Sequence, residues 1–163
     1  PIADQNFSKF DMSFYSTRPD GRSGISPREN MEYNLGECKT YAAKFSKDSP
    51  NLLLFGSTGL GKTFLSTCIA EAVSARGFSV AYDTAINIVA AYETIKFGSG
   101  DGEAAAERAA RYERADLLII DDMGTEMGTA FTVSALYNLI NNRLMAKRPM
   151  IINTNLLPDC SPA

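Results

Sequence analysis

Residues Gly56 to Thr63 read GSTGLGKT and form the clearest candidate binding motif in the chain. This segment matches G-x-x-x-x-G-K-[ST], in which glycines let the backbone curve around an anion with successive N–H groups pointing inward. Lys62 is placed to reach the β- and γ-phosphates of a nucleotide, and the Thr63 hydroxyl to ligate Mg²⁺. A chain of this length matches by accident only about once in 200. The segment predicts a phosphate-binding loop (P-loop).

The sequence on both sides of the P-loop fits the same prediction. Leu52 to Phe55 form a short apolar run, as expected of a buried strand, and apolar residues recur at helical spacing from Phe64 to Arg76. Strand, glycine loop and helix are the context that the motif needs, and the helix N-terminus adds its partial positive charge. We therefore expect the nucleotide to be bound by Gly56, Ser57, Thr58, Gly59, Leu60, Gly61, Lys62, Thr63 and Phe64.

Two aspartates form a second element with chemical meaning. The apolar residues 117–120 are followed by Asp121 and Asp122, which is the arrangement of a Walker B element. Mg²⁺ keeps several waters and takes one or two protein carboxylates, so we expect Asp121 to hold it beside Thr63. We expect Asp122 to be catalytic, accepting a proton from the water that attacks the γ-phosphate or orienting that water. Aspartates also end strands in ordinary turns, and this pair gains its meaning from the P-loop.

A third candidate follows the last predicted strand, where the sequence reads Asn153-Thr154-Asn155. A polar amide at the end of a strand beside the P-loop strand can contact the γ-phosphate or the attacking water. Asparagine is also a common turn former. We expect Asn155 to fill this role, with Asn153 as the substitute, and we place Lys62, Asp122 and Asn155 together as the catalytic set.

Short strands alternate with helical segments along the chain. Strands are expected at 52–55, 78–82, 116–120 and 149–152, and helices between them and from Ser26-Pro27-Arg28-Glu29, a capping box with proline at the first helical position. Such alternation predicts an α/β fold with a parallel sheet covered by helices on both faces. Ligands of these sheets sit at the carboxyl ends of the strands, where all the candidate residues fall.

The composition restricts the class of protein. The 163 residues carry a formal net charge of −3, which is unlike a strongly basic nucleic-acid binder but leaves a local basic patch possible. The chain has no histidine and only three cysteines, far apart, which disfavours a zinc site and histidine-based catalysis and fits a reducing compartment. No apolar run approaches the roughly 18 residues of a membrane span. We expect a cytoplasmic protein with no membrane partner.

Phosphoryl transfer also needs a further cation, typically an arginine finger, for full rate. Arg143 and Arg148 flank the last strand, but neither stands in a recognisable finger position. We therefore expect an ATPase that is weak in isolation.

Beyond the P-loop, the stretches FDMSFYS, GISPRENM, NLLLFGSTGLGKTFLS, DLLIIDDMGTE and IINTNL resemble the AAA+ ATPases of the DnaC/DnaI/IstB type, the bacterial helicase loaders and transposition helpers. The resemblance covers roughly residues 7–156. It implies a P-loop NTPase fold of AAA+ type that uses ATP and Mg²⁺. It assigns Lys62 and Thr63 to Walker A, Asp121 and Asp122 to Walker B, and Asn155 to sensor 1.

The resemblance also implies partners. They are a replicative helicase of the DnaB type, single-stranded DNA facing the helices of residues 85–114, and further copies of the chain in a ring or spiral. We expect residues 1–27 to be an N-terminal segment packing near the nucleotide and residues 28–163 to be the ATPase core, without the part after sensor 1 that normally carries the arginine finger. We expect no counterpart of the family's helicase-binding N-terminal region in the residues before Phe7.

Three other functions stay open. A transposition helper of the IstB type would share the same ATP site and differ in its partner, a transposase. A P-loop kinase of a small molecule would need an arginine-rich lid, which the sequence does not display. A nucleotide-dependent binding module would bind ATP and scarcely turn it over.

Overall fold

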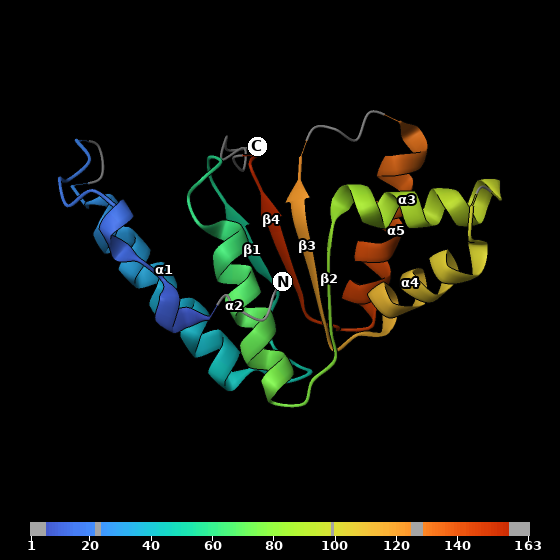
Figure 1. Ribbon diagram of the computed structural model, residues 1–163, viewed down its shortest axis with the longest axis horizontal. Helices are drawn as coiled ribbons and strands as arrows, with labels where there is room; N and C mark the ends of the chain where they lie inside the picture. Colours follow the sequence, from blue (N-terminus) through green and yellow to red (C-terminus); the bar gives the residue numbers. More distant parts are fainter. Residues whose placement is uncertain (1–5, 22–23, 99, 125–128, 157–163) are drawn as a thin grey trace.

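The computed structural model describes residues 6–21, 24–98, 100–124 and 129–156. Two short 3-10 helices come first, and helices and strands then alternate except that α4 directly follows α3 (Figure 1). The elements are η2 (Phe7–Lys9), η3 (Met12–Phe14), α1 (Pro27–Lys44), β1 (Leu52–Phe55), α2 (Lys62–Ala75), β2 (Val80–Thr84), α3 (Ala85–Phe97), α4 (Gly102–Arg114), β3 (Leu117–Met123), α5 (Ala130–Met145) and β4 (Met150–Thr154).

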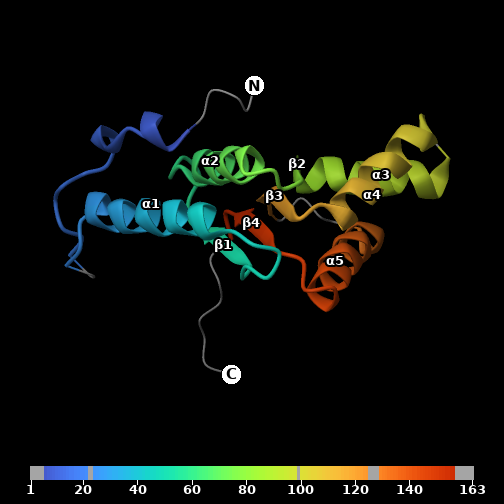
Figure 2. The same cartoon turned by 90° about the horizontal axis from the view of Figure 1, so that it is seen from below.

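The strands form one parallel sheet in the order β1-β4-β3-β2. Helices α1 and α2 lie on one side of this sheet, and α3, α4 and α5 lie on the other (Figure 2). The predicted fold class, an α/β fold with a parallel sheet covered on both faces, is therefore confirmed. Because β1 and β3 are both paired to β4, their carboxyl ends lie on either side of the end of β4.

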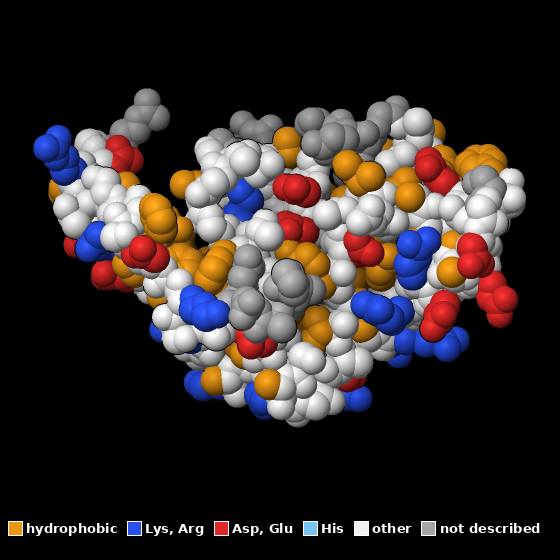
Figure 3. Space-filling model, in the orientation of Figure 1, with side chains coloured by type: hydrophobic (Ala, Val, Ile, Leu, Met, Phe, Trp, Pro, Cys, Tyr) orange, Lys and Arg blue, Asp and Glu red, His pale blue; other side chains and the backbone are white. Residues whose placement is uncertain are grey.

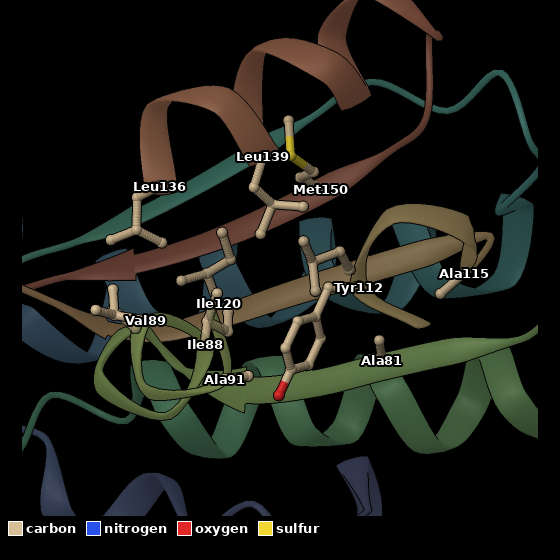
Figure 4. Packing of buried hydrophobic residues seen from close by; sticks show 12 residues of the cluster. Ala81, Ile88, Val89, Ala91, Tyr112, Ala115, Ile120, Leu136, Leu139 and Met150 are labelled. Carbon is tan, nitrogen blue, oxygen red and sulfur yellow. The ribbon is translucent and has the colours of Figure 1, made fainter. Parts of the chain in front are cut away.

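The central strand β3 contributes to the core on both faces. Its residues 117–120 are fully buried. Leu117 and Ile119 pack with α1 and α2, while Leu118 and Ile120 pack with α3, α4 and α5. Figure 4 shows the second of these cores, where Leu136 and Leu139 of α5 and Tyr112 of α4 surround the side chains of the sheet. A strand buried on both faces reads as a continuous apolar run, as the sequence does here.

Local signals in the sequence account for several helix boundaries. The Ser26 hydroxyl accepts a hydrogen bond from the Glu29 N–H, and the Glu29 carboxylate accepts one from the Ser26 N–H, so α1 begins with the predicted capping box. Thr84, Asp101 and Thr129 cap α3, α4 and α5 in the same manner with one side-chain acceptor each.

One face of β1 remains accessible. Leu53 and Phe55 are each 52% exposed, although Leu52 and Leu54 on the other face pack with α2. Leu53 is opposite Ile152 of β4 in the register, which places the exposed face on the same side as α5.

Among the described residues, no helix is both long enough and apolar enough to span a lipid bilayer.

Candidate nucleotide-binding site

The P-loop connects β1 to α2 and has three glycines with positive φ, Gly56, Gly59 and Gly61. Gly56 is buried with φ 138°, and Gly61 is the N-cap of α2 with φ 87°, a left-handed conformation that glycine adopts without strain. Helix α2 begins at Lys62, so its first N–H groups face the turn. Between Gly56 and Gly61, residues 57–60 are exposed. The loop therefore offers backbone donors and a helix N-terminus to an anion.

Lys62 points back across the mouth of the loop. Its Nζ donates hydrogen bonds to Gly56 O at 2.8 Å, to Ser57 O at 2.9 Å and to Asn155 Oδ1 at 2.8 Å. An ammonium group has three N–H donors, so these contacts use all of them. The structure thus brings together the predicted Walker A lysine and the predicted sensor residue, which are 93 positions apart in the sequence. Any phosphate that Lys62 binds must replace part of this set.

Asp121 lies beside the start of α2 and is only 5% exposed. Thr63 Oγ1 donates to Asp121 Oδ1 at 3.3 Å, and Asn153 Nδ2 donates to the same oxygen at 2.9 Å. The Tyr82 hydroxyl donates to Oδ2 at 2.5 Å. Burial, and after it the hydrogen bond to Asp121, raise the pKa of Tyr82 to about 12, so the phenol remains a donor.

A local irregularity in β3 separates the two predicted acids. Between Ile120 and Met123 the strand takes three residue steps while β4 takes two, from Ile152 to Thr154, so β3 carries one extra residue. Asp122 occupies this bulge with φ 52° and is exposed, while Asp121 stays buried. The prediction that both acids follow the end of the strand was wrong in detail, because β3 runs on to Met123. The bulge directs adjacent carboxylates to different surroundings.

The prediction for β4 needs a similar correction. The strand runs to Thr154, so Asn153 lies inside it rather than after it, and only Asn155 follows the strand. Asn153 is 1% exposed, and its Nδ2 bridges Ser66 Oγ at 2.8 Å and Asp121. The two asparagines therefore differ in position: Asn155 contacts Lys62, and Asn153 contacts the buried acid.

The oxygens of Thr63 and Asp121 fit a magnesium ion. Two neighbouring ligands of an octahedral Mg²⁺ lie about 3 Å apart, because each Mg–O distance is about 2.1 Å. The observed separation of 3.3 Å between Thr63 Oγ1 and Asp121 Oδ1 is close to this value. Within the described ranges, no group of three or more His, Cys, Asp and Glu residues is placed to hold a metal. Thr63 and Asp121 are the residues that would hold Mg²⁺ together with nucleotide oxygens and water.

The N-terminal segment packs against the P-loop. The Tyr15 hydroxyl donates to Leu60 O at 3.1 Å, and Phe10 stacks on Tyr15 and meets Phe64 edge to face. A Cβ atom on Gly61 would lie 2.7 Å from the Tyr15 hydroxyl oxygen. Figure 3 shows hydrophobic side chains gathered where α1 and α2 adjoin. Phe64 therefore packs against the N-terminal segment, and this segment leaves no room for a side chain at Gly61.

The two arginines beside β4 are both engaged in the fold. Arg143 is 1% exposed, and its guanidinium donates to the backbone oxygens of Tyr112, Glu113, Ala115 and Pro149. Burial lowers the pKa of Arg143 to about 10. Arg148 donates to two carbonyl oxygens at the end of α4, those of residues 113 and 114. Both guanidinium groups therefore bind backbone oxygens of α4, and that of Arg143 also binds the backbone oxygen of the residue before β4.

Tyr82 and Ser66 are the site residues that sequence reasoning missed. Tyr82 reads as one more aromatic residue in an apolar strand, and Ser66 as one polar residue in an amphipathic helix. The sequence signal for Tyr82 was its place in a predicted strand, because a tyrosine on a strand paired with the Walker B strand can reach the Walker B aspartate. Only the pairing of β2 with β3 makes that geometry visible.

Comparison with known proteins identifies the family of the chain. The family model for the IstB-like ATP binding protein matches residues 37–158, which contain every predicted site residue. The replicative helicase loader DnaC of Escherichia coli K12 is 25% identical over 154 residues, covering 85% of this chain and 62% of DnaC. An ATP-binding protein in an insertion sequence of Mycobacterium tuberculosis is 28% identical over 109 residues, covering 67% of this chain and 42% of that protein.

A solved structure shares the fold. The crystal structure of the DnaC helicase loader superimposes with a TM-score of 0.72 and 17% sequence identity, covering 98% of this chain and 81% of that chain. The chain spans 62% of the length of the curated DnaC that it matches. Since the family model covers well over half of the residues, the chain belongs to the IstB-like ATP-binding proteins, within the AAA+ group that its motifs resemble.

Proposed function

We propose that this chain is the core of an ATPase that loads or remodels a replicative helicase of the DnaB type on DNA. The observation that carries the proposal is the convergence of Lys62, Thr63, Asp121 and Asn155 at one edge of the sheet. Membership of an ATP-binding family supports the nucleotide, and the DnaC relative, which is named as a replicative helicase loader, supports the partner.

In this proposal each site residue has one role. The P-loop N–H groups and Lys62 bind the phosphates, and Lys62 exchanges its present oxygen acceptors for phosphate oxygens. Thr63 and Asp121 would hold Mg²⁺, which would supply positive charge beside the phosphates. Asp122, exposed on the bulge, orients or deprotonates the attacking water. Asn155, released from Lys62, contacts the γ-phosphate or that water.

Turnover depends on a further cation in the transition state. Arg143 and Arg148 both donate hydrogen bonds to backbone oxygens of their own chain. We therefore propose that ATP hydrolysis is slow in the single chain. Its rate rises when copies assemble into a ring or spiral, or when single-stranded DNA binds.

We also propose a division of the chain into two parts. In this division residues 1–27 are an N-terminal segment, of which the described residues Phe10 and Tyr15 contact Phe64 and Leu60 at the P-loop, and residues 28–163 are the ATPase core. Right-handed crossovers place any further connection from β4 to the free edge of β1 on the α5 side of the sheet. Leu53 and Phe55 are exposed on that side and would be covered by it.

The test measures ATP hydrolysis by this chain alone, with single-stranded DNA, and with a DnaB-type helicase. We expect slow phosphate release that rises with DNA or helicase and is abolished in Asp122→Asn. Asparagine is the matched replacement because it tolerates the left-handed conformation at this position, so the variant keeps its fold. Hydrolysis at the parent rate by Asp122→Asn, or phosphate transfer to a small molecule instead of water, would overturn the proposal.

A second candidate is supported by the relative in an insertion sequence and by the family model. In it the same ATP site serves a transposition helper of the IstB type. Pull-downs with a DnaB-type helicase and with a transposase, each with and without ATP, distinguish the two. ATP-dependent retention of the transposase alone would favour this candidate.

A further inference from the structure

The carboxylate of Asp121 is held from both sides by residues that reach it from neighbouring strands. On one side, the Tyr82 hydroxyl of β2 donates to Oδ2 at 2.5 Å. On the other, Asn153 Nδ2 of β4 donates to Oδ1 at 2.9 Å. We refer to Tyr82 and Asn153 as the Asp121 clamp. Since β2 and β4 flank β3 in the sheet, the clamp is built from elements that are themselves fixed by strand pairing.

The clamp separates the two oxygens of the carboxylate. Oδ1 also accepts hydrogen bonds from the Asp122 N–H at 2.9 Å and from Thr63 Oγ1 at 3.3 Å, so it is the oxygen that faces the P-loop. Oδ2 is turned toward Tyr82. Rotation of the carboxylate about its Cβ–Cγ bond would break the bonds on both sides, so the clamp fixes its orientation.

The Asn153 arm of the clamp is anchored in its turn. Its Nδ2 also donates to Ser66 Oγ at 2.8 Å, and the Ser66 hydroxyl donates to Thr63 O at 3.1 Å. The chain of contacts therefore returns to the residue whose hydroxyl faces Asp121. Ser66 is fully buried and Asn153 is 1% exposed, so these bonds are shielded from water.

We propose that Tyr82 and Asn153 are positioning residues that keep Asp121 Oδ1 beside the Thr63 hydroxyl, in the orientation that a phosphate-bound Mg²⁺ needs. The inference rests on the proposed ATP site and adds residues that no Walker motif contains. Groups that orient a metal ligand typically change metal affinity or activity about 10- to 100-fold when they are removed. The clamp should accordingly set the Mg²⁺ requirement of nucleotide binding, with little effect on phosphate contacts made without the metal.

The experiment titrates Mg²⁺ into the full chain with a fluorescent ATP analogue and compares the parent with Tyr82→Phe. Mg²⁺ should increase the affinity for the ATP analogue, and we expect the Mg²⁺ concentration that gives half of this increase to be about 10-fold or more higher in Tyr82→Phe than in the parent. The affinity of the variant in EDTA should stay within about twofold of the parent's. Tyr112→Phe is the matched control, because the Tyr112 hydroxyl also donates to a carboxylate, Asp83 Oδ2 at 2.7 Å, away from the P-loop. The control should keep the parent's Mg²⁺ requirement.

Thermal melting of each variant reports on folding separately. A structural role alone would lower the melting temperature of Tyr82→Phe and of Tyr112→Phe and leave both Mg²⁺ titrations unchanged, which would overturn the inference. If Tyr82→Phe does not fold, Ser66→Ala loosens the Asn153 arm, and an unchanged Mg²⁺ requirement in that variant would overturn it equally. If the parent binds the analogue no more tightly with Mg²⁺ than in EDTA, the proposed ATP site itself fails.

Discussion

Replacing Asn155 tests how Lys62 is held before a nucleotide arrives. Lys62 Nζ has three oxygen acceptors, and Asn155 Oδ1 at 2.8 Å is the one supplied by a side chain. A hydrogen bond to a charged group contributes about 1.5–3 kcal/mol when buried. Asn155 is exposed, so we take about 0.5–1 kcal/mol for this one. ADP, which has no γ-phosphate for Asn155 to contact, must displace this bond in order to engage Lys62 fully.

At 1.4 kcal/mol for each tenfold change, Asn155→Ala should therefore bind ADP about 2- to 5-fold more tightly than the parent. Asn155→Asp should bind ADP more weakly, because a carboxylate holds the ammonium and repels the phosphates. Titration of a fluorescent ADP analogue in EDTA measures both, with Asn141→Ala, an exposed asparagine of α5, as the control. Equal affinities in all the variants, or changes of the same sign in Asn155→Ala and Asn155→Asp, would refute this account of Lys62.

Three further predictions concern stability. Gly61→Ala should lower the melting temperature by several degrees, because a residue with a Cβ costs about 1–2 kcal/mol in the left-handed conformation and its Cβ would meet the Tyr15 hydroxyl. Adding Tyr15→Phe should restore part of this loss, and additive losses in the double variant would contradict the contact. Arg143→Met should lower the free energy of unfolding in urea by about 3 kcal/mol or more, because it leaves buried carbonyl oxygens without their donor. Arg148→Met should lower it by less than about 1 kcal/mol, and equal losses in the two variants would contradict the difference in their burial. The Ser79 N–H and the Lys47 ammonium lower the pKa of Asp116, so its contribution to stability is present above its unfolded pKa near 3.9 and is lost as the pH falls through the lower folded value. Asp116→Asn should therefore reduce the loss of unfolding free energy below about pH 4, and the same loss in parent and variant would contradict this prediction.

Much of the fold was predictable because local signals and long-range pairing agree. The capping box at Ser26 marks the start of α1, and the apolar run of residues 117–120 marks a strand buried on both faces. The P-loop motif fixes the connection of β1 to α2 and the place of Lys62. The site edge follows because parallel strands with right-handed crossovers bring their carboxyl ends together.

Other parts of the site depend on contacts that leave no local pattern. The extra residue at Asp122 arises from how β3 pairs with β4, and nothing in the letters DD indicates it. Tyr82 reaches Asp121 only because β2 lies beside β3. Arg143 reads as a charge at the end of a helix, yet it is buried among carbonyl oxygens that come from α4 and from the start of β4. In each case the tertiary partner, not the residue type, decides the role.

The central claim is that the P-loop edge of this sheet binds Mg·ATP through Lys62. Isothermal titration calorimetry of the parent and of Lys62→Ala with Mg·ATP tests it most directly, with melting curves to show that both are folded. We predict measurable heat and a defined dissociation constant for the parent, and binding at least about tenfold weaker for Lys62→Ala, from the loss of charged hydrogen bonds. Equal binding by the two folded proteins, or no heat with the parent, would contradict the claim.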